Sequence, residues 1–122
     1  MRILVIDDEE DMCWALRMIL EVEGHTSMVA MNAEGALLLL EKETFELAFV
    51  DAKLPDMEGT DLLARIHVKC PDLPCVLVSG YLYDDDDLVQ TCRSRGLIRA
   101  FIGKPFLLTQ VRDVLHSVTN AP

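Results

Sequence analysis

A chain of 122 residues can bury one hydrophobic core without disulfide bonds, so we expect a single domain spanning residues 1-122. The hydrophobic content of 51% and the charged content of 26% are those of a folded globular protein and exclude a disordered chain. A net charge of -10 argues against nucleic acid as a direct partner and disfavours anionic membrane surfaces, because phosphate groups attract basic faces.

Strand and helix patterns alternate from the N-terminus. The run from Arg2 to Ile6 predicts a strand, and the next segment predicts a helix from near Glu10 to Glu23, stopped by Gly24. Its inner stripe is expected to comprise Met12, Leu16, Ile19 and Leu20. A shorter strand follows from Thr26 to Ala30, and Asn32 caps a helix that ends at about Lys42.

The second half continues the same alternation. The expected strands here are Leu47 to Val50, Cys75 to Val78, and Arg99 to Ile102. Between them lie a helix from Thr60 to Lys69 and another that starts within Asp84 to Asp87 and ends by Gly96. The last helix ends near Thr119, and its apolar face is expected to contain Leu107, Val111, Val114, Leu115 and Val118. Five strands alternating with five helices predict an α/β fold with a doubly wound parallel sheet, covered by helices on both faces.

No segment reaches the roughly 20 apolar residues of a membrane span, and the run from Ile3 to Ile6 is too short for a signal peptide. The four cysteines have no zinc-site spacing, and most lie in or beside apolar segments. They are Cys13, Cys70, Cys75 and Cys92. We therefore expect reduced thiols in a cytoplasmic protein.

Polar side chains follow four of the predicted strands at their carboxyl ends. Asp7 and Asp8 follow the first strand, Asp51 the third, Ser79 the fourth, and Lys104 comes just after the fifth. Parallel strands bring such ends to one edge, where open α/β sheets hold ligands. Three clustered carboxylates repel one another by several kcal/mol at a protein-surface dielectric of about 20, and a single lysine leaves them net negative. The pattern favours a site for a divalent cation and a phosphoryl group.

The stretches that carry these residues read ILVIDDEE, DAKLPDMEG, LVSGY and GKPF. As a set they resemble the response-regulator receiver domain, the CheY-like family of two-component signalling, from Ile3 to about Val118. The resemblance implies a flavodoxin-like sheet with strand order 2-1-3-4-5 and a cis peptide bond between Lys104 and Pro105. Proline statistics alone favour trans there, because only about 5% of such bonds are cis in folded proteins.

By the same resemblance Asp51 accepts a phosphoryl group from a histidine kinase or a phosphotransfer domain. Mg²⁺ is held by Asp7, Asp8, Asp51 and the backbone carbonyl of Lys53. Beyond this modification and its slow hydrolysis, no enzymatic activity is expected.

The remaining implied roles concern the response to phosphate. Lys104 pairs with Asp51 and then with the phosphoryl group, to which Ser79 donates its hydroxyl. Phe101 corresponds to the family's switch aromatic, whereas its position in the sequence alone favours a plain core residue. The altered surface is expected to control an effector domain or a homodimer. The four aspartates Asp84 to Asp87 are expected to be solvated residues at the start of a helix. The alternative is that they contribute to the recognition of a partner protein.

Three other functions are compatible with parts of the pattern. A receiver-like interaction domain that no longer uses phosphate is one, although all five chemical positions are intact. An aspartate-based phosphatase is a second, but its usual acid two residues after the nucleophile is here Lys53. A flavin-binding domain lacks the Gly/Ser/Thr-rich loop after the first strand that cradles a phosphate. Both a stand-alone regulator and the receiver part of a longer protein fit the sequence.

Overall fold

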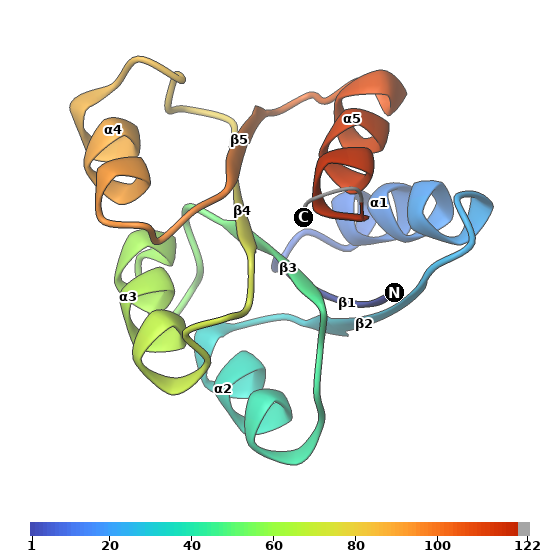
Figure 1. Ribbon diagram of the computed structural model, residues 1–122, viewed down its shortest axis with the longest axis horizontal. Coiled ribbons are helices and arrows are strands. Elements are labelled where there is room, and N and C mark those ends of the chain that lie inside the picture. The colour runs from blue at the N-terminus through green and yellow to red at the C-terminus, as the bar shows by residue number, and fades with distance from the viewer. Residues whose placement is uncertain (120–122) are drawn as a thin grey trace.

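The computed structural model describes residues 1–119, in which five strands and five helices alternate (Figure 1). The strands are β1 (Arg2–Ile6), β2 (Thr26–Ala30), β3 (Leu47–Asp51), β4 (Cys75–Ser79) and β5 (Ala100–Gly103). The helices are α1 (Glu10–Val22), α2 (Ala33–Lys42), α3 (Gly59–Lys69), α4 (Asp87–Ser94) and α5 (Leu108–Thr119). The alternation that the sequence pattern predicts is confirmed.

All neighbouring strands are parallel, and their order is β2-β1-β3-β4-β5. Ile6 is level with Val50, Asp51 with Val78, and Ser79 with Gly103. This register aligns the carboxyl ends of the four strands that precede the polar residues. The doubly wound sheet and its order are therefore as expected, and the strand ends meet at one edge.

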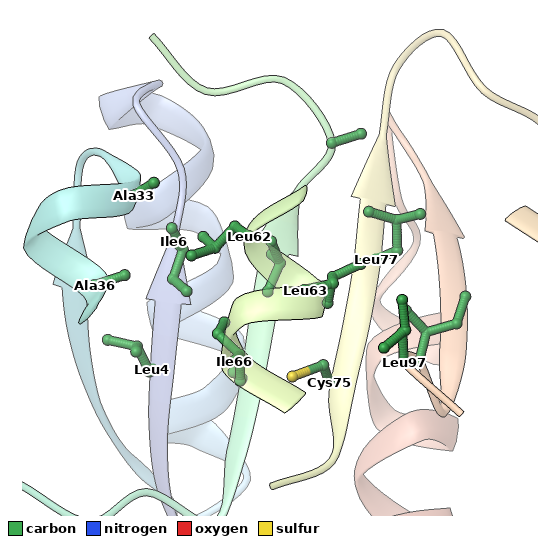
Figure 2. Packing of buried hydrophobic residues seen from close by; sticks show 14 of the residues in the cluster. Leu4, Ile6, Ala33, Ala36, Leu62, Leu63, Ile66, Cys75, Leu77 and Leu97 are labelled. Atoms are coloured by element: carbon green, nitrogen blue, oxygen red, sulfur yellow. The ribbon is translucent and has the colours of Figure 1, made fainter. Parts of the chain in front are cut away.

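Helices cover both faces of the sheet (Figure 1). Helices α1 and α5 lie on one side, while α2, α3 and α4 lie on the other. Successive strand residues point to opposite faces, so Leu4 and Ile6 join the α2–α3–α4 cluster and Ile3 and Val5 join the α1–α5 cluster. Figure 2 shows Leu4 and Ile6 on the first of these faces, with Ile6 near Leu62 of α3. Burial on both faces explains the continuous apolar character of β1, β3 and β4.

Two helix ends have the expected local chemistry. The side chain of Asn32 accepts a hydrogen bond from the Gly35 N–H at 2.7 Å, which caps α2. Gly24 follows α1 with a φ of +89°, a left-handed conformation that glycine adopts without strain. Helix α4 begins at Asp87, so the preceding aspartates lie in the loop before it.

The apolar faces differ from expectation at two places. Leu107 precedes α5 and is 66% exposed, so its assignment to the inner face was wrong; its backbone N–H donates to the Gln110 side chain instead, and Phe106 packs on the α1–α5 cluster. In α1 the buried position beside Leu16 belongs to Cys13, while Met12 is only half-buried. The cysteine thiol donates to the Asp7 carbonyl at 3.3 Å, which draws it inward.

The four cysteines are free thiols, as expected. Within residues 1–119 no helix has both the length and the apolar character that crossing a bilayer requires.

Candidate functional site

Three acidic side chains converge where β1 and β3 end. Oxygen atoms of Asp7, Asp8 and Asp51 all lie within 4.8 Å of one another. Asp7 and Asp51 are buried, whereas Asp8 is exposed at the rim. Three hard oxygen donors at this spacing fit a divalent cation such as Mg²⁺, which keeps several water ligands besides a few carboxylates.

Lys104 is the cation of this cluster. It follows β5, and its Nζ lies 3.0 Å from Asp7 Oδ2, 3.0 Å from Glu9 Oε1 and 3.4 Å from Asp51 Oδ1. Its side chain is only 11% exposed. The expected pairing with Asp51 is present, but it is the longest of three contacts. The sequence reasoning missed Glu9, because one glutamate in an acidic run carries no signal that distinguishes it from a solvated residue.

The buried charges perturb one another strongly. Burial and the neighbouring Asp7 raise the pKa of Asp51 to about 6, although Lys104 and a backbone hydrogen bond from Lys53 oppose the change. Burial by itself lowers the pKa of Lys104, but hydrogen bonds to Glu9 and Asp7 and the charges of Asp7 and Asp51 raise it above its ordinary range. The lysine therefore stays charged, while Asp51 binds protons more readily than an exposed aspartate.

Ser79 ends β4 and is buried beside this cluster. Its Oγ accepts hydrogen bonds from the backbone N–H groups of Tyr81 at 3.1 Å and Leu82 at 3.0 Å. The hydroxyl thus connects the strand end to the loop that leads to α4. Any movement of Ser79 changes the hydrogen bonding of that loop.

The loop after Asp51 is held by two close contacts. Gly59 begins α3 and donates its N–H to the Ala52 carbonyl at 2.8 Å, and a Cβ atom on Gly59 would lie 2.0 Å from the Asp51 carbonyl oxygen. Only a residue without a side chain fits there. At the middle of the loop, Asp56 accepts hydrogen bonds from the N–H groups of Ala33 and Glu34, which lowers its pKa. Asp56 therefore ties this loop to the start of α2.

The cluster opens into a cavity of about 400 Å³ at the surface. Asp8, Asp51 and Lys104 line it together with Lys53 and Tyr81. Tyr81 is 52% exposed, and its pKa is raised by partial burial and by the charges of Glu58 and Asp51. An anionic group can therefore reach Asp51 from solvent past Tyr81 and Lys53.

The comparisons with known proteins agree on the family. The family model for the response regulator receiver domain matches residues 3–116 of this sequence. The chain belongs to this family. It is similar to a CheY-like response regulator receiver domain of Methanospirillum hungatei JF-1, with 36% identity, a TM-score of 0.83, and coverage of 97% of this chain and 90% of that one.

Two curated relatives extend this result. Sporulation initiation phosphotransferase F of Bacillus subtilis is 28% identical over 93% of this chain and 90% of the relative. The alginate biosynthesis transcriptional regulatory protein AlgB of Pseudomonas aeruginosa is 36% identical over 66% of this chain, and the match spans 18% of that relative. The receiver fold thus matches both a relative of similar length and part of a much longer one.

The resemblance implied a cis peptide bond, which this receiver domain contains, and a switch role for Phe101, which stays a prediction. The Lys104-Pro105 bond is cis. Phe101 lies on β5, level with Leu77 of β4, and is half-buried against the α2–α3–α4 cluster. Both the core position favoured by the sequence and the edge position of a switch aromatic fit this intermediate burial.

Proposed function

We propose that this receiver domain is a phosphorylation-dependent signalling switch in which Asp51 accepts a phosphoryl group from a histidine kinase or a phosphotransfer domain. The observation that carries the proposal is the buried Asp51 carboxylate, within reach of Lys104 and beside the acid pair, at the bottom of an open cavity. An Asp51 oxygen attacks the phosphorus, the O–P bond forms, and the P–N bond of the donor breaks with its electron pair going to the imidazole.

Mg²⁺ fits the acid cluster, and we propose that Asp7, Asp8, Asp51 and the backbone carbonyl of Lys53 hold it. Bound there, the cation neutralises negative charge on the incoming phosphoryl group. The protein's own contribution is to keep Lys104 charged and buried, so that its ammonium balances the same charge. Asp7 is fixed for this role by accepting the Glu9 N–H at 2.9 Å.

Ser79 connects the modification to the surface in this proposal. Its oxygen accepts two backbone N–H groups, which leaves the hydroxyl proton to donate to a phosphoryl oxygen. A shift of Ser79 toward the phosphate strains the bonds to Tyr81 and Leu82, and the loop follows. Phe101 is then free to move inward from the sheet edge.

Three exposed apolar side chains lie on segments that adjoin this loop and β5: Tyr83 before α4, and Leu107 and Leu108 at the start of α5, which are 73%, 66% and 44% exposed. We propose that phosphorylation changes the surface at these residues for an effector domain or a second copy of the chain. The relative AlgB is by name a transcriptional regulatory protein, which is consistent with an effector partner. The protein itself acts as a cytoplasmic signalling module and needs no direct contact with nucleic acid or membrane. We also propose that residues 1-122 belong to a single receiver domain.

Incubation with acetyl phosphate and Mg²⁺ tests the assignment. Intact-mass measurement should detect a single added phosphoryl group that is lost in base, and Asp51→Asn should abolish it. Asp85→Asn removes the same charge from an exposed loop and should label like the wild type. Unchanged labelling of the Asp51→Asn variant would refute Asp51 as the acceptor. An unlabelled wild type would favour a phosphate-independent interaction domain.

A further inference from the structure

The ammonium of Lys104 is shared between the phosphoacceptor and a residue outside the proposed metal site. Glu9 Oε1 accepts a hydrogen bond from Nζ at 3.0 Å, whereas Asp51 Oδ1 is 3.4 Å from the same nitrogen. The Glu9 side chain is 60% exposed, and the Asp51 side chain is 7% exposed. The ammonium of Lys104 is therefore held by the exposed Glu9 and the buried Asp7, each at 3.0 Å, more closely than by Asp51.

The geometry leaves the lysine few alternatives. An ammonium group has three N–H donors, and three carboxylates surround this one within 3.4 Å. A phosphoryl oxygen on Asp51 can gain Lys104 only if one of these carboxylates gives up its share. Charge-assisted hydrogen bonds of this kind are roughly twice as strong as neutral ones. Replacing a carboxylate by a phosphoryl oxygen as the partner of Lys104 therefore changes the energy of the phosphorylated state.

The identity of the competing carboxylate follows from the roles of the three acids, which rest on the proposed function. Asp51 becomes a neutral acyl group when it is phosphorylated, so its hold on the lysine weakens. Asp7 is placed in the metal site, and a bound cation shares its charge. Glu9 takes part in neither change, and it keeps a full negative charge 3.0 Å from Nζ.

We propose that Glu9 is a positioning residue that competes with the phosphoryl group for the ammonium of Lys104. Its hydrogen bond keeps part of the ammonium away from Asp51 and thereby slows phosphorylation of Asp51 and shortens the life of the product. Replacing Glu9 by glutamine removes the charge but keeps the length and shape of the side chain. The lysine is then released toward Asp51.

The test compares Glu9→Gln with Glu10→Gln. Glu10 is the next residue in the chain, is also exposed, and begins α1, and its substitution changes the net charge equally. With acetyl phosphate at saturating Mg²⁺, we expect Glu9→Gln to phosphorylate about threefold faster than the wild type, a change of about 0.6 kcal/mol in the barrier. Glu10→Gln should stay close to the wild type.

Two further measurements separate positioning from a general structural effect. The gain should appear in the rate constant at saturating acetyl phosphate, because the Lys104 contact acts on the reacting group, and loss of the phosphoryl group should be slower. Glu9→Asp, which keeps the charge but shortens the reach, should lie between the wild type and Glu9→Gln. Equal rates for Glu9→Gln and Glu10→Gln, or a slower Glu9→Gln, would overturn the inference. A wild type without any labelling of Asp51 would instead overturn the proposed function on which it rests.

Discussion

Gly59→Ala is a sharp test of how the fold positions Asp51. Alanine is normally the better helix former by about 1 kcal/mol, and Gly59 is the first residue of α3, so helix propensity alone favours the substitution. The tertiary structure opposes it. The new Cβ would lie 2.0 Å from the Asp51 carbonyl oxygen, 2.8 Å from the Ala52 Cα and 2.9 Å from the Asp51 carbonyl carbon.

The size of the effect follows from these contacts. The closest one is about 1.4 Å short of the 3.4 Å at which ordinary van der Waals contact begins. All three opposing atoms belong to the backbone, which cannot swing away as the end of a side chain does. Overpacking costs typically 1–3 kcal/mol, and separating the segments loses the Gly59–Ala52 hydrogen bond, worth about 1 kcal/mol. We expect a net loss of about 3 kcal/mol in the free energy of unfolding, or roughly 10 °C in Tm.

Thermal and urea unfolding would measure this loss, and acetyl phosphate labelling would report the position of Asp51. We expect Gly59→Ala to phosphorylate at least tenfold more slowly even where it is fully folded, because the clash moves the backbone of the acceptor itself. Gly80→Ala is the matched control, since its Cβ would meet only the Lys104 side chain, Cβ at 3.7 Å and Cδ at 4.0 Å, which are ordinary contacts. A Gly59→Ala variant as stable and as reactive as the wild type would refute the reasoning.

Two other predictions concern pH and the lifetime of the phosphoryl group. Because burial and Asp7 raise the folded-state pKa of Asp51 to about 6, the protonated side chain favours the fold, and this contribution is lost as pH rises from about 4 through 6. With metal ions removed by a chelator, urea unfolding should show the free energy of unfolding of Asp51→Asn increasing relative to that of the wild type by about 2 to 3 kcal/mol from pH 4 to pH 7. A difference that stays constant over this range would contradict the buried charge of Asp51. Phosphorylation of the wild type should rise through pH 6, and higher Mg²⁺ should move that midpoint down. Tyr81 and Lys53 line the approach to Asp51, so Tyr81→Ala or Lys53→Ala should speed phosphoryl loss severalfold at saturating Mg²⁺ by admitting water; identical decay in all three proteins would exclude this gating.

Much of the fold could be predicted from local sequence. Continuous apolar runs such as Leu47 to Val50 indicate strands buried on both faces, and Asn32 and Gly24 mark helix ends through their own chemistry. These signals are local, because each depends on a few neighbouring residues. The polar residues at strand ends were predictable for a related reason. Once the strands are parallel, the positions of Asp7, Asp51 and Ser79 after them determine that they meet.

The tertiary structure decided what local patterns do not contain. Glu9 reaches Lys104, which lies 95 positions further along the chain, and no sequence signal separates it from its solvated neighbour Glu10. No local pattern indicates that position 59 requires glycine; the requirement comes from the Asp51 backbone that passes beside it. Leu107 fitted the helical periodicity and is nevertheless exposed, because α5 begins one residue later. For Glu9 and Gly59 the deciding contact joins segments that only the packed sheet and helices bring together, so the sequence predicted the chemistry of the site and the fold determined its pairings.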